Sequence, residues 1–236
     1  MKRIAVLLMM LISMSGLTAC AEANADIFNA SVREQPEKIH DDISAENIQH
    51  VTINGNARSI VIRQSENECF EIHNGDLNPD HTYEVRCNEN GETLDINVMM
   101  ENAENDNNIL GSVLIDIPQK EFEEIEVAGD FSRISLYTLN SDVLINANNS
   151  FVNLDFEADR LKHNVTLDGS ESNAFRGVSV YLDKFPDNVG MDLNLIQGGT
   201  INDPQDMLKN NELESGADKP IISINNTKEI NFYSKD

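Results

Sequence analysis

Apolar and polar residues alternate in short runs along most of the chain after about residue 45. Alternation with a period of two is typical of β-strands that bury one face, because successive side chains of a strand point to opposite sides. We therefore predict a mainly β protein. The runs in the first half are Val51–Ile53, Ile60–Ile62, Phe70–Ile72, Tyr83–Val85, Leu94–Val98 and Val113–Ile117.

The second half repeats more regularly, as a series of apolar-x-apolar cores separated by turn residues such as Gly129 and Asp130. Successive cores start 9, 9, 9, 13, 13 and 11 residues apart. The cores are Ile125-x-Val127, Ile134-x-Leu136, Val143-x-Ile145, Val152-x-Leu154, Val165-x-Leu167, Val178-x-Val180 and Val189-x-Met191.

Two architectures produce short strands at this spacing, an antiparallel β-sandwich and a β-solenoid. The near-constant spacing and the 30 asparagines favour a single-stranded, right-handed solenoid over residues 124–202. Asparagine side chains stack into hydrogen-bonded ladders and tolerate the left-handed backbone of tight corners. We expect N-terminal strands or a hairpin before the solenoid and a C-terminal cap after it, and the antiparallel sandwich remains the alternative.

The run from Phe122 to Leu136, FEEIEVAGDFSRISL, and the run from Asn140 to Ala147, NSDVLINA, carry a family resemblance. They resemble the repeated Ile-x-Val-x-Gly-Asp and Ser-Asp-Val-x-Ile units of the bacterial putative-adhesin family that includes the auto-transporter adhesin head, or GIN, domain. The resemblance extends from Val51 to about Leu195. It implies a short β-solenoid on an exported or lipid-anchored chain, and it brings no active-site residues with it.

The N-terminus has the three parts of an export signal. Lys2 and Arg3 precede an uncharged apolar run from Ile4 to Ile12, which is too short to cross a bilayer of ~30 Å hydrocarbon. Leu17-Thr18-Ala19-Cys20 resembles the bacterial lipobox, which implies lipid attachment at Cys20 and cleavage just before it. The alternative is an ordinary secretory signal that is cut after Ala19 or later and leaves the protein unattached.

These segments predict three parts of the chain. Residues 1–19 are a lipoprotein signal peptide, the polar and aperiodic residues 20–44 are a flexible tether, and residues 45–236 form the β-solenoid adhesin-like domain. The predicted location is extracytoplasmic, with the lipid on Cys20 holding the protein to the bacterial membrane at the periplasmic face or the cell surface.

The charge balance limits the partners. With 17 Lys and Arg against 41 Asp and Glu, the formal net charge is −24. Nucleic acid is therefore an unlikely ligand, because its binding depends on cationic side chains that neutralise phosphates. Such a surface is usually just solvated, although it also favours basic partners.

Cys69 and Cys87 lie in two strand-like runs on either side of a turn-rich segment centred on Asn78. We predict a hairpin that places the two cysteines opposite each other in a structural disulfide, with two free thiols as the alternative. His73 and His81 flank the same turn, where a third ligand for a metal is lacking.

Neither a cofactor nor a metal site is predicted. Asp76-x-Asn78-x-Asp80 begins like a calcium loop, but His81 and Cys87 stand where that loop requires glycine and glutamate. The acidic cluster of Glu121, Glu123, Glu124 and Glu126 alternates with apolar residues and fits the solvent side of a strand. No nucleophile elbow, phosphate loop or zinc spacing is present in the sequence.

The sequence therefore predicts a non-catalytic cell-envelope lipoprotein that acts as an adhesin-like binding or structural module. Its expected partners are the membrane, through the lipid on Cys20, and an envelope or surface protein or glycan. One alternative is an enzyme acting on envelope polysaccharide, against which the 6% aromatic content and the absence of Trp argue. Another is an acidic accessory lipoprotein that docks on a basic envelope partner.

Overall fold

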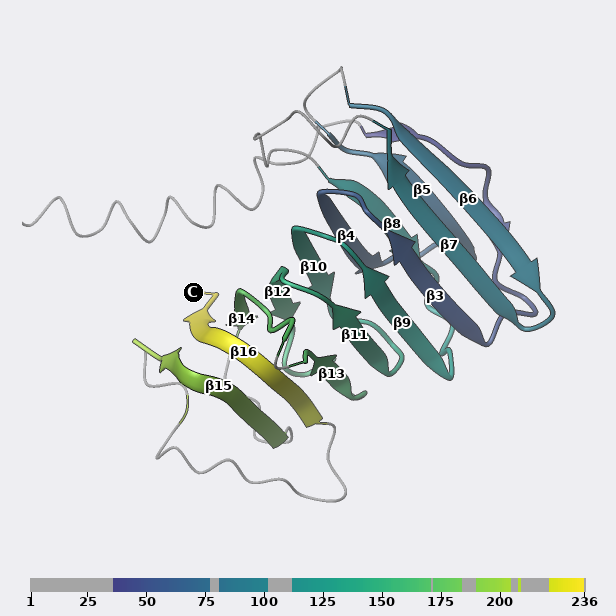
Figure 1. Ribbon diagram of the computed structural model, residues 1–236. Helices are drawn as coiled ribbons and strands as arrows, with labels where there is room; N and C mark the ends of the chain where they lie inside the picture. The colour runs from purple at the N-terminus through teal and green to yellow at the C-terminus, as the bar shows by residue number, and fades with distance from the viewer. Residues whose placement is uncertain are drawn as a thin grey trace, which may run out of the picture.

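The computed structural model describes residues 36–76, 81–101, 112–170, 172–183, 190–204, 208 and 221–235. Every regular element among them is a β-strand, and the strands form one large mixed sheet that does not close on itself (Figure 1). The prediction of a mainly β protein is confirmed. Over the same residues, no helix has the length and apolar character needed to span a membrane.

The first eight strands are β1 (Glu37–Lys38), β2 (Ile43–Ser44), β3 (His50–Gly55), β4 (Ser59–Gln64), β5 (Cys69–Asn74), β6 (Tyr83–Asn90), β7 (Thr93–Met100) and β8 (Val113–Ile117). The other eight are β9 (Glu124–Gly129), β10 (Arg133–Tyr137), β11 (Val143–Ala147), β12 (Phe151–Phe156), β13 (Val165–Asp168), β14 (Gly177–Leu182), β15 (Gly190–Asn202) and β16 (Ile221–Ser234).

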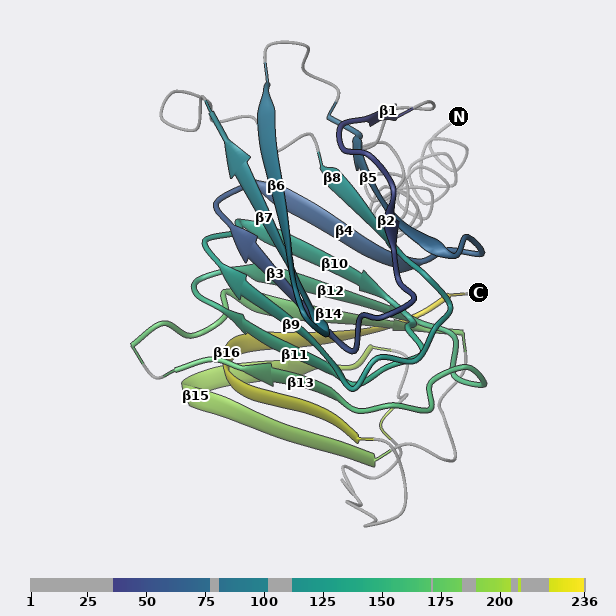
Figure 2. The same cartoon turned by 90° about the vertical axis from the view of Figure 1, so that its right-hand side faces the viewer.

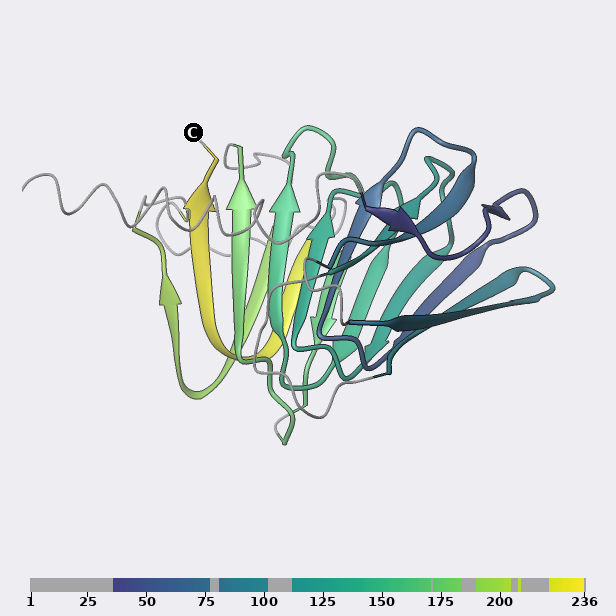
Figure 3. The same cartoon turned by 90° about the horizontal axis from the view of Figure 1, so that it is seen from above.

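The sheet consists of two rows of strands joined by β16. Row 1 contains β6, β7, β3, β9, β11 and β13, and row 2 contains β5, β8, β4, β10, β12 and β14. The strand β16 pairs with β13 through Ile222 and with β14 through Ile230, so it passes from one row to the other. Figure 1 shows β3, β9, β11 and β13 in front of β4, β10, β12 and β14, and Figure 3 shows β16 bending between the rows.

From β9 to β14, parallel pairing joins strands that are two apart in the chain. Ile125 in β9 lies opposite Val143 in β11, which lies opposite Val165 in β13. The same relation holds in row 2 for β10, β12 and β14. The apolar cores that recur every 18 to 26 residues therefore stack in register. Figure 2 shows the strands of the two rows stacked one above another.

The core lies between the two rows. Ile53 and Ile145 of row 1 and Ile62 and Leu154 of row 2 have no exposed surface and belong to one apolar cluster. Full burial of each such side chain contributes about 1.5–3 kcal/mol. Because the cluster extends along both rows, each pair of strands is stabilised mainly by the pairs above and below it.

Strands β5 and β6 do not form the predicted hairpin. β5 pairs antiparallel with β8 in row 2, where Ile72 lies opposite Ile115. β6 pairs antiparallel with β7 in row 1, where Val85 lies opposite Val98. The prediction was wrong because the two strands cover the edges of different rows instead of pairing with each other. The centre of the predicted turn, Asn78, lies outside the described residues.

The two cysteines consequently lie on different rows. Cys69 is opposite Ser44 on β2, and Cys87 is opposite Ile96 on β7. Both are free thiols and half-buried. The predicted disulfide depended on the hairpin, so the structure corresponds to the alternative of two free thiols.

The folded part begins before residue 45. Strands β1 and β2, in the segment predicted to be a tether, pair antiparallel with β5, and Ile43 is only 6% exposed opposite Phe70. This segment pairs with an edge of β5 that would otherwise be open. The predicted signal peptide of residues 1–19, Cys20 and the tether up to residue 35 lie outside the described residues.

The C-terminal strand, β16, lies between other strands instead of at the edge of the sheet. β16 lies between β15 on one side and β13 and β14 on the other, in parallel with all three. The strands expected around Ile222 and Ile230 are therefore present, as one continuous strand, and β15 forms the outermost position.

Candidate binding surface

One line of polar and aromatic side chains crosses the outer surface of row 2. Each member from β8 onward directly follows an apolar core, as Tyr137 follows Leu136, and alternation therefore turns it outward. We call this line the outer ladder. In spatial order it contains Glu71 on β5, Asp116 on β8, Arg63 on β4, Tyr137 on β10, Asp155 on β12, Tyr181 on β14 and Tyr233 on β16.

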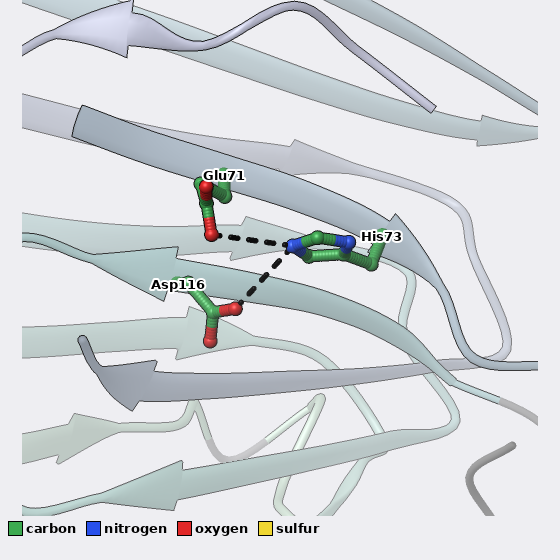
Figure 4. Close-up of side chains that lie close together, drawn as sticks. All are labelled: Glu71, His73 and Asp116. Carbon is green, nitrogen blue, oxygen red and sulfur yellow. Dashed lines mark ion pairs between the residues drawn. The ribbon is translucent and has the colours of Figure 1, made fainter. Parts of the chain in front are cut away.

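The N-terminal half of the outer ladder is an ion-pair network. Arg63 donates to both carboxylate oxygens of Asp116, with Nη2 3.1 Å from Oδ2, and this hydrogen bonding raises the pKa of Arg63. His73 Nε2 lies 3.5 Å from Asp116 Oδ2 and 3.6 Å from Glu71 Oε2 (Figure 4). Lys38 Nζ lies 3.3 Å from Glu71 Oε1. The network links β1, β5, β8 and β4.

The same cluster has the donor atoms for a metal ion. Glu71, His73 and Asp116 each offer one ligand atom, and the three atoms lie within 4.8 Å of one another. Both carboxylates already pair with a cation, Lys38 or Arg63, and a divalent ion there would face two positive charges at close range. We therefore interpret the cluster as a structural ion-pair network.

The C-terminal half of the outer ladder is aromatic. The rings of Tyr181 and Tyr233 stack with centroids 4.9 Å apart and an interplanar angle of 18°. Asp155, which lies opposite Tyr181 on the neighbouring strand β12, pairs with Lys235. Burial raises the pKa of Tyr137 and that of Tyr181, so both phenols are protonated at neutral pH.

Beside this aromatic half, Phe151 is the most exposed large apolar side chain in the described part of the chain, with 45% of its surface accessible. A Cβ atom on Gly177 would lie 3.5 Å from the Phe151 ring, which shows that the ring rests over this glycine of the neighbouring strand. The Arg176 guanidinium carbon lies 5.9 Å from the ring centroid. On the other side, Arg133 of β10 is opposite Phe151.

The outer surface of row 1 is polar and acidic. Glu124 and Glu126 point outward from β9, as the sequence predicts. A hollow of about 440 Å³ lies there among Glu124, Asp142 and Asp192, and Asp142 already accepts hydrogen bonds from the backbone and side chain of Asn164.

Asparagines pair across neighbouring strands, as expected for the start of a ladder. Asn194 donates to Asn225 over 2.9 Å, and Asn202 donates to Asn231 over 2.8 Å. These pairs lie at the β15–β16 end of the sheet. Among the described residues, no asparagine–asparagine hydrogen bond is seen in the middle of the stack.

The histidines that were predicted to flank a hairpin turn lie in separate clusters. His73 belongs to the ion-pair network, whereas His81 Nδ1 lies 2.6 Å from Asp76 Oδ2. Tyr83 donates to the same oxygen over 2.5 Å, and Asp76 is 1% exposed. Asp76 thus anchors the start of β6, and residues 77–80 of the rejected calcium loop, which include Asn78 and Asp80, lie outside the described residues.

Sequence reasoning missed the outer ladder, although a signal for it was present. In five strands of the outer ladder, β4, β10, β12, β14 and β16, the residue directly after the apolar core is Arg63, Tyr137, Asp155, Tyr181 and Tyr233, respectively. Aligning that position would have revealed three of the chain's four tyrosines on one line. A count of aromatic residues over the whole chain hides this concentration.

The chain is thus an all-β protein with stacked parallel strands and with aromatic and charged side chains on the outer face of row 2. A solved putative cell adhesion protein from Clostridium sporogenes is similar in structure, with a TM-score of 0.53 and 15% sequence identity, over 85% of this chain and 100% of that chain. A putative adhesin from Bacteroides fragilis also matches, at a TM-score of 0.32 and 11% identity over 86% and 100% of the two chains. No protein-family model and no curated protein matches the sequence.

Proposed function

We propose that this chain is a non-catalytic, adhesin-like binding module of the bacterial cell surface, built as a short right-handed β-solenoid. Parallel pairing of every second strand supports the solenoid, because each pair of row 1 and row 2 strands then forms one coil. Crossovers between parallel strands are right-handed in about 98% of cases. Stacked coils present rigid faces of the kind that adhesion requires.

The observation that carries the proposal is the concentration of aromatic groups on the outer face of row 2, together with Arg133 and Arg176, which form no ion pair within the described residues. The fold shared with the putative cell adhesion protein of Clostridium sporogenes is consistent with the same role. The other outer face is solvated by carboxylates and asparagines, which serve solubility.

An adhesion assay tests the proposal. Beads that carry the full chain are expected to attach to at least one of three coated surfaces, mucin, fibronectin or peptidoglycan, more strongly than beads with an unrelated protein of similar net charge. The matched control is Ile145→Asp, which places a charge in the core at a residue with no exposed surface and should abolish attachment by unfolding the chain. Equal attachment of all three bead types, or of none, would refute an adhesive role.

The same proposal places the chain on the membrane through a lipid on Cys20. Cys20→Ser is expected to move the protein from the membrane fraction to the soluble extracytoplasmic fraction and to abolish incorporation of labelled palmitate, because the thioether can no longer form. Cys69→Ser is the control and should leave both unchanged. Membrane association that persists in Cys20→Ser would contradict lipid anchoring.

The enzyme alternative and the docking of the acidic face on a basic partner predict different results. An envelope polysaccharide hydrolase releases new reducing ends from its substrate on incubation with the full chain, whereas a binding module releases none. Docking through the acidic face is abolished when carboxylates of row 1 such as Glu126 are neutralised, and binding through row 2 is not.

A further inference from the structure

Arg133 on β10 and Arg176, which directly precedes β14, form no ion pair with a carboxylate of the described residues. Within the part of the chain that the structure describes, Arg63, Arg86 and Arg160 each form an ion pair with an acidic side chain. Neither Arg133 nor Arg176 has a carboxylate within 4 Å in those residues. Arg176 instead donates from Nε to Asn149 over 2.9 Å. In a chain with 41 acidic residues, two such groups on one face are unusual.

These two cations flank one exposed ring. Arg133 lies opposite Phe151 on the neighbouring strand, and Arg176 approaches the ring to 5.9 Å. The Phe151 ring lies over Gly177, where an added Cβ would be in van der Waals contact with it at 3.5 Å. One side of the ring therefore faces the sheet while 45% of the Phe151 surface stays accessible.

Polar groups suited to hydroxyl recognition surround this ring. Asn153 and Ser179 share the next outward line on β12 and β14, and the protonated phenols of Tyr137 and Tyr181 lie one line further. Two carboxylates of neighbouring strands are engaged, since Asp155 pairs with Lys235 and Glu229 accepts from Asn202. From β10 to β16 the surface spans three strand spacings, about 14 Å, enough for a short oligosaccharide.

We propose that this surface, defined by Arg133, Phe151, Arg176 and the tyrosines of the outer ladder, binds an acidic glycan that carries uronic acid sugars. This deepens the proposed function and rests on it. The apolar face of a sugar ring packs on Phe151, the sugar carboxylate accepts hydrogen bonds from Arg133 and Arg176, and sugar hydroxyls bond to Asn153 and Ser179.

Charge decides between the ligand classes. A neutral glycan would leave two guanidinium groups without a counter-charge, whereas a carboxylate beside Phe151 pairs with both. Nucleic acid repeats its phosphates along a length greater than this surface, and the acidic remainder of the chain, at −24 overall, repels it. An acidic sugar needs only the local positive charge.

Biolayer interferometry on the full chain in mild detergent tests the proposal with three probes: an oligogalacturonate, a neutral cello-oligosaccharide of equal length and dextran sulfate. We expect the oligogalacturonate alone to bind saturably. Arg133→Gln and Arg176→Gln are each expected to weaken it at least about tenfold, because each removes a charge-assisted hydrogen bond to the sugar carboxylate. Phe151→Ala should weaken it similarly.

Arg86→Gln is the matched control, because it removes one positive charge from row 1, away from the proposed glycan surface around Phe151. It should change the affinity less than twofold. Circular dichroism confirms that each variant is folded. Stronger binding of the neutral probe, equal binding of dextran sulfate, or equal losses in Arg86→Gln and Arg133→Gln would each overturn the acidic-glycan proposal.

The same variants separate this inference from the proposed function. Bead attachment that persists in Arg133→Gln and Phe151→Ala, without oligogalacturonate binding by the unaltered chain, overturns the glycan ligand and leaves the adhesive role intact. Absence of bead attachment to all surfaces overturns the proposed function itself.

Discussion

Gly55 and Gly129 lie where the chain turns from row 1 to row 2, and both have a positive φ. A Cβ atom on Gly129 would lie 2.3 Å from the carbonyl oxygen of Gly55, and one on Gly55 would lie 1.9 Å from that of Val98. Successive turns of the chain thus approach each other too closely for any side chain. These two positions hold the vertical spacing of the stack at its corners.

Gly129→Ala is therefore expected to lower the free energy of unfolding by about 3 kcal/mol or more, because rigid backbone must move in addition to the strain of a positive φ. Gly91→Ala is the matched control: its φ is +65°, but no atom lies within 4 Å of the added Cβ, so it should cost only about 1 kcal/mol. Urea denaturation followed by circular dichroism measures both. Equal losses would show that strain alone, and not the close approach of the coils, determines the requirement for glycine.

Cys87 illustrates how burial controls the reactivity of a single residue. Its sulfur packs in row 1, and burial, with a smaller contribution from Glu89, raises the pKa of the thiol to about 11. Since the thiolate is the reactive form, a rise from 9 to about 11 lowers its population at pH 7 about 100-fold.

Iodoacetamide is expected to alkylate Cys87 about 100-fold more slowly in the folded chain than in urea, with a rate that rises about tenfold per pH unit up to about pH 11. Folding favours the neutral thiol of Cys87. The raised pKa therefore contributes a stabilisation that is complete below pH 9 and is lost as the pH rises towards 11. Mass spectrometry of peptides, alkylated without reduction, measures the rate. A peptide pair linked through Cys69 and Cys87 would contradict the two free thiols.

At the scale of elements, β16 contributes more than an ordinary terminal strand. It pairs with three other strands, and Ile222, Ile224, Ile230 and Phe232 are all at most 1% exposed in the core. Without it, β13, β14 and β15 would each have an unpaired edge. The last strand of the chain therefore completes both rows.

Phe232→Ala should lower the free energy of unfolding by about 3–5 kcal/mol, because it removes a fully buried ring and leaves a cavity. Phe151→Ala, in which the same ring is 45% exposed, should cost less than about 1 kcal/mol. Thermal or urea unfolding of the two variants provides the comparison. A small loss for Phe232→Ala would mean that β16 is not an integral part of the stack.

At the scale of the whole molecule, the excess of acidic side chains opposes folding. A net charge of −24 repels itself over the compact surface, and salt shortens the range of this repulsion from ~30 Å at 0.01 M to ~8 Å at 0.15 M. Ion pairs such as Arg63 with Asp116 are screened as well, but the 41 acidic side chains far outnumber the 17 Lys and Arg that could pair with them.

Raising NaCl from 10 to 150 mM is therefore expected to raise Tm by at least about 3 °C, which corresponds to ~1 kcal/mol for a chain of this size. Near the sequence pI of about 4.3, where the net charge vanishes, the same salt change should have no stabilising effect. Calorimetry at the two pH values tests this. A Tm that falls with salt at neutral pH would mean that ion pairs outweigh repulsion.

The sequence by itself determined the all-β character and the approximate positions of most strands. Alternation such as Ile134-x-Leu136 indicates which side chains of a strand are buried, whatever the rest of the chain does. Glycine and asparagine mark the turns. In the second half, the cores that the sequence marks as strands lie next to each other in the sheet, as Ile125 and Val143 do.

Only the tertiary structure decided which strands are neighbours where the spacing is irregular. β5 and β6 are adjacent in sequence, yet each covers the edge of a different row, because the apolar surfaces available there outweigh a local turn. The outer ladder and the surface around Phe151 arise in the same way. Their members, from Arg63 to Tyr233, are distant in sequence, and stacking alone brings their outward side chains together.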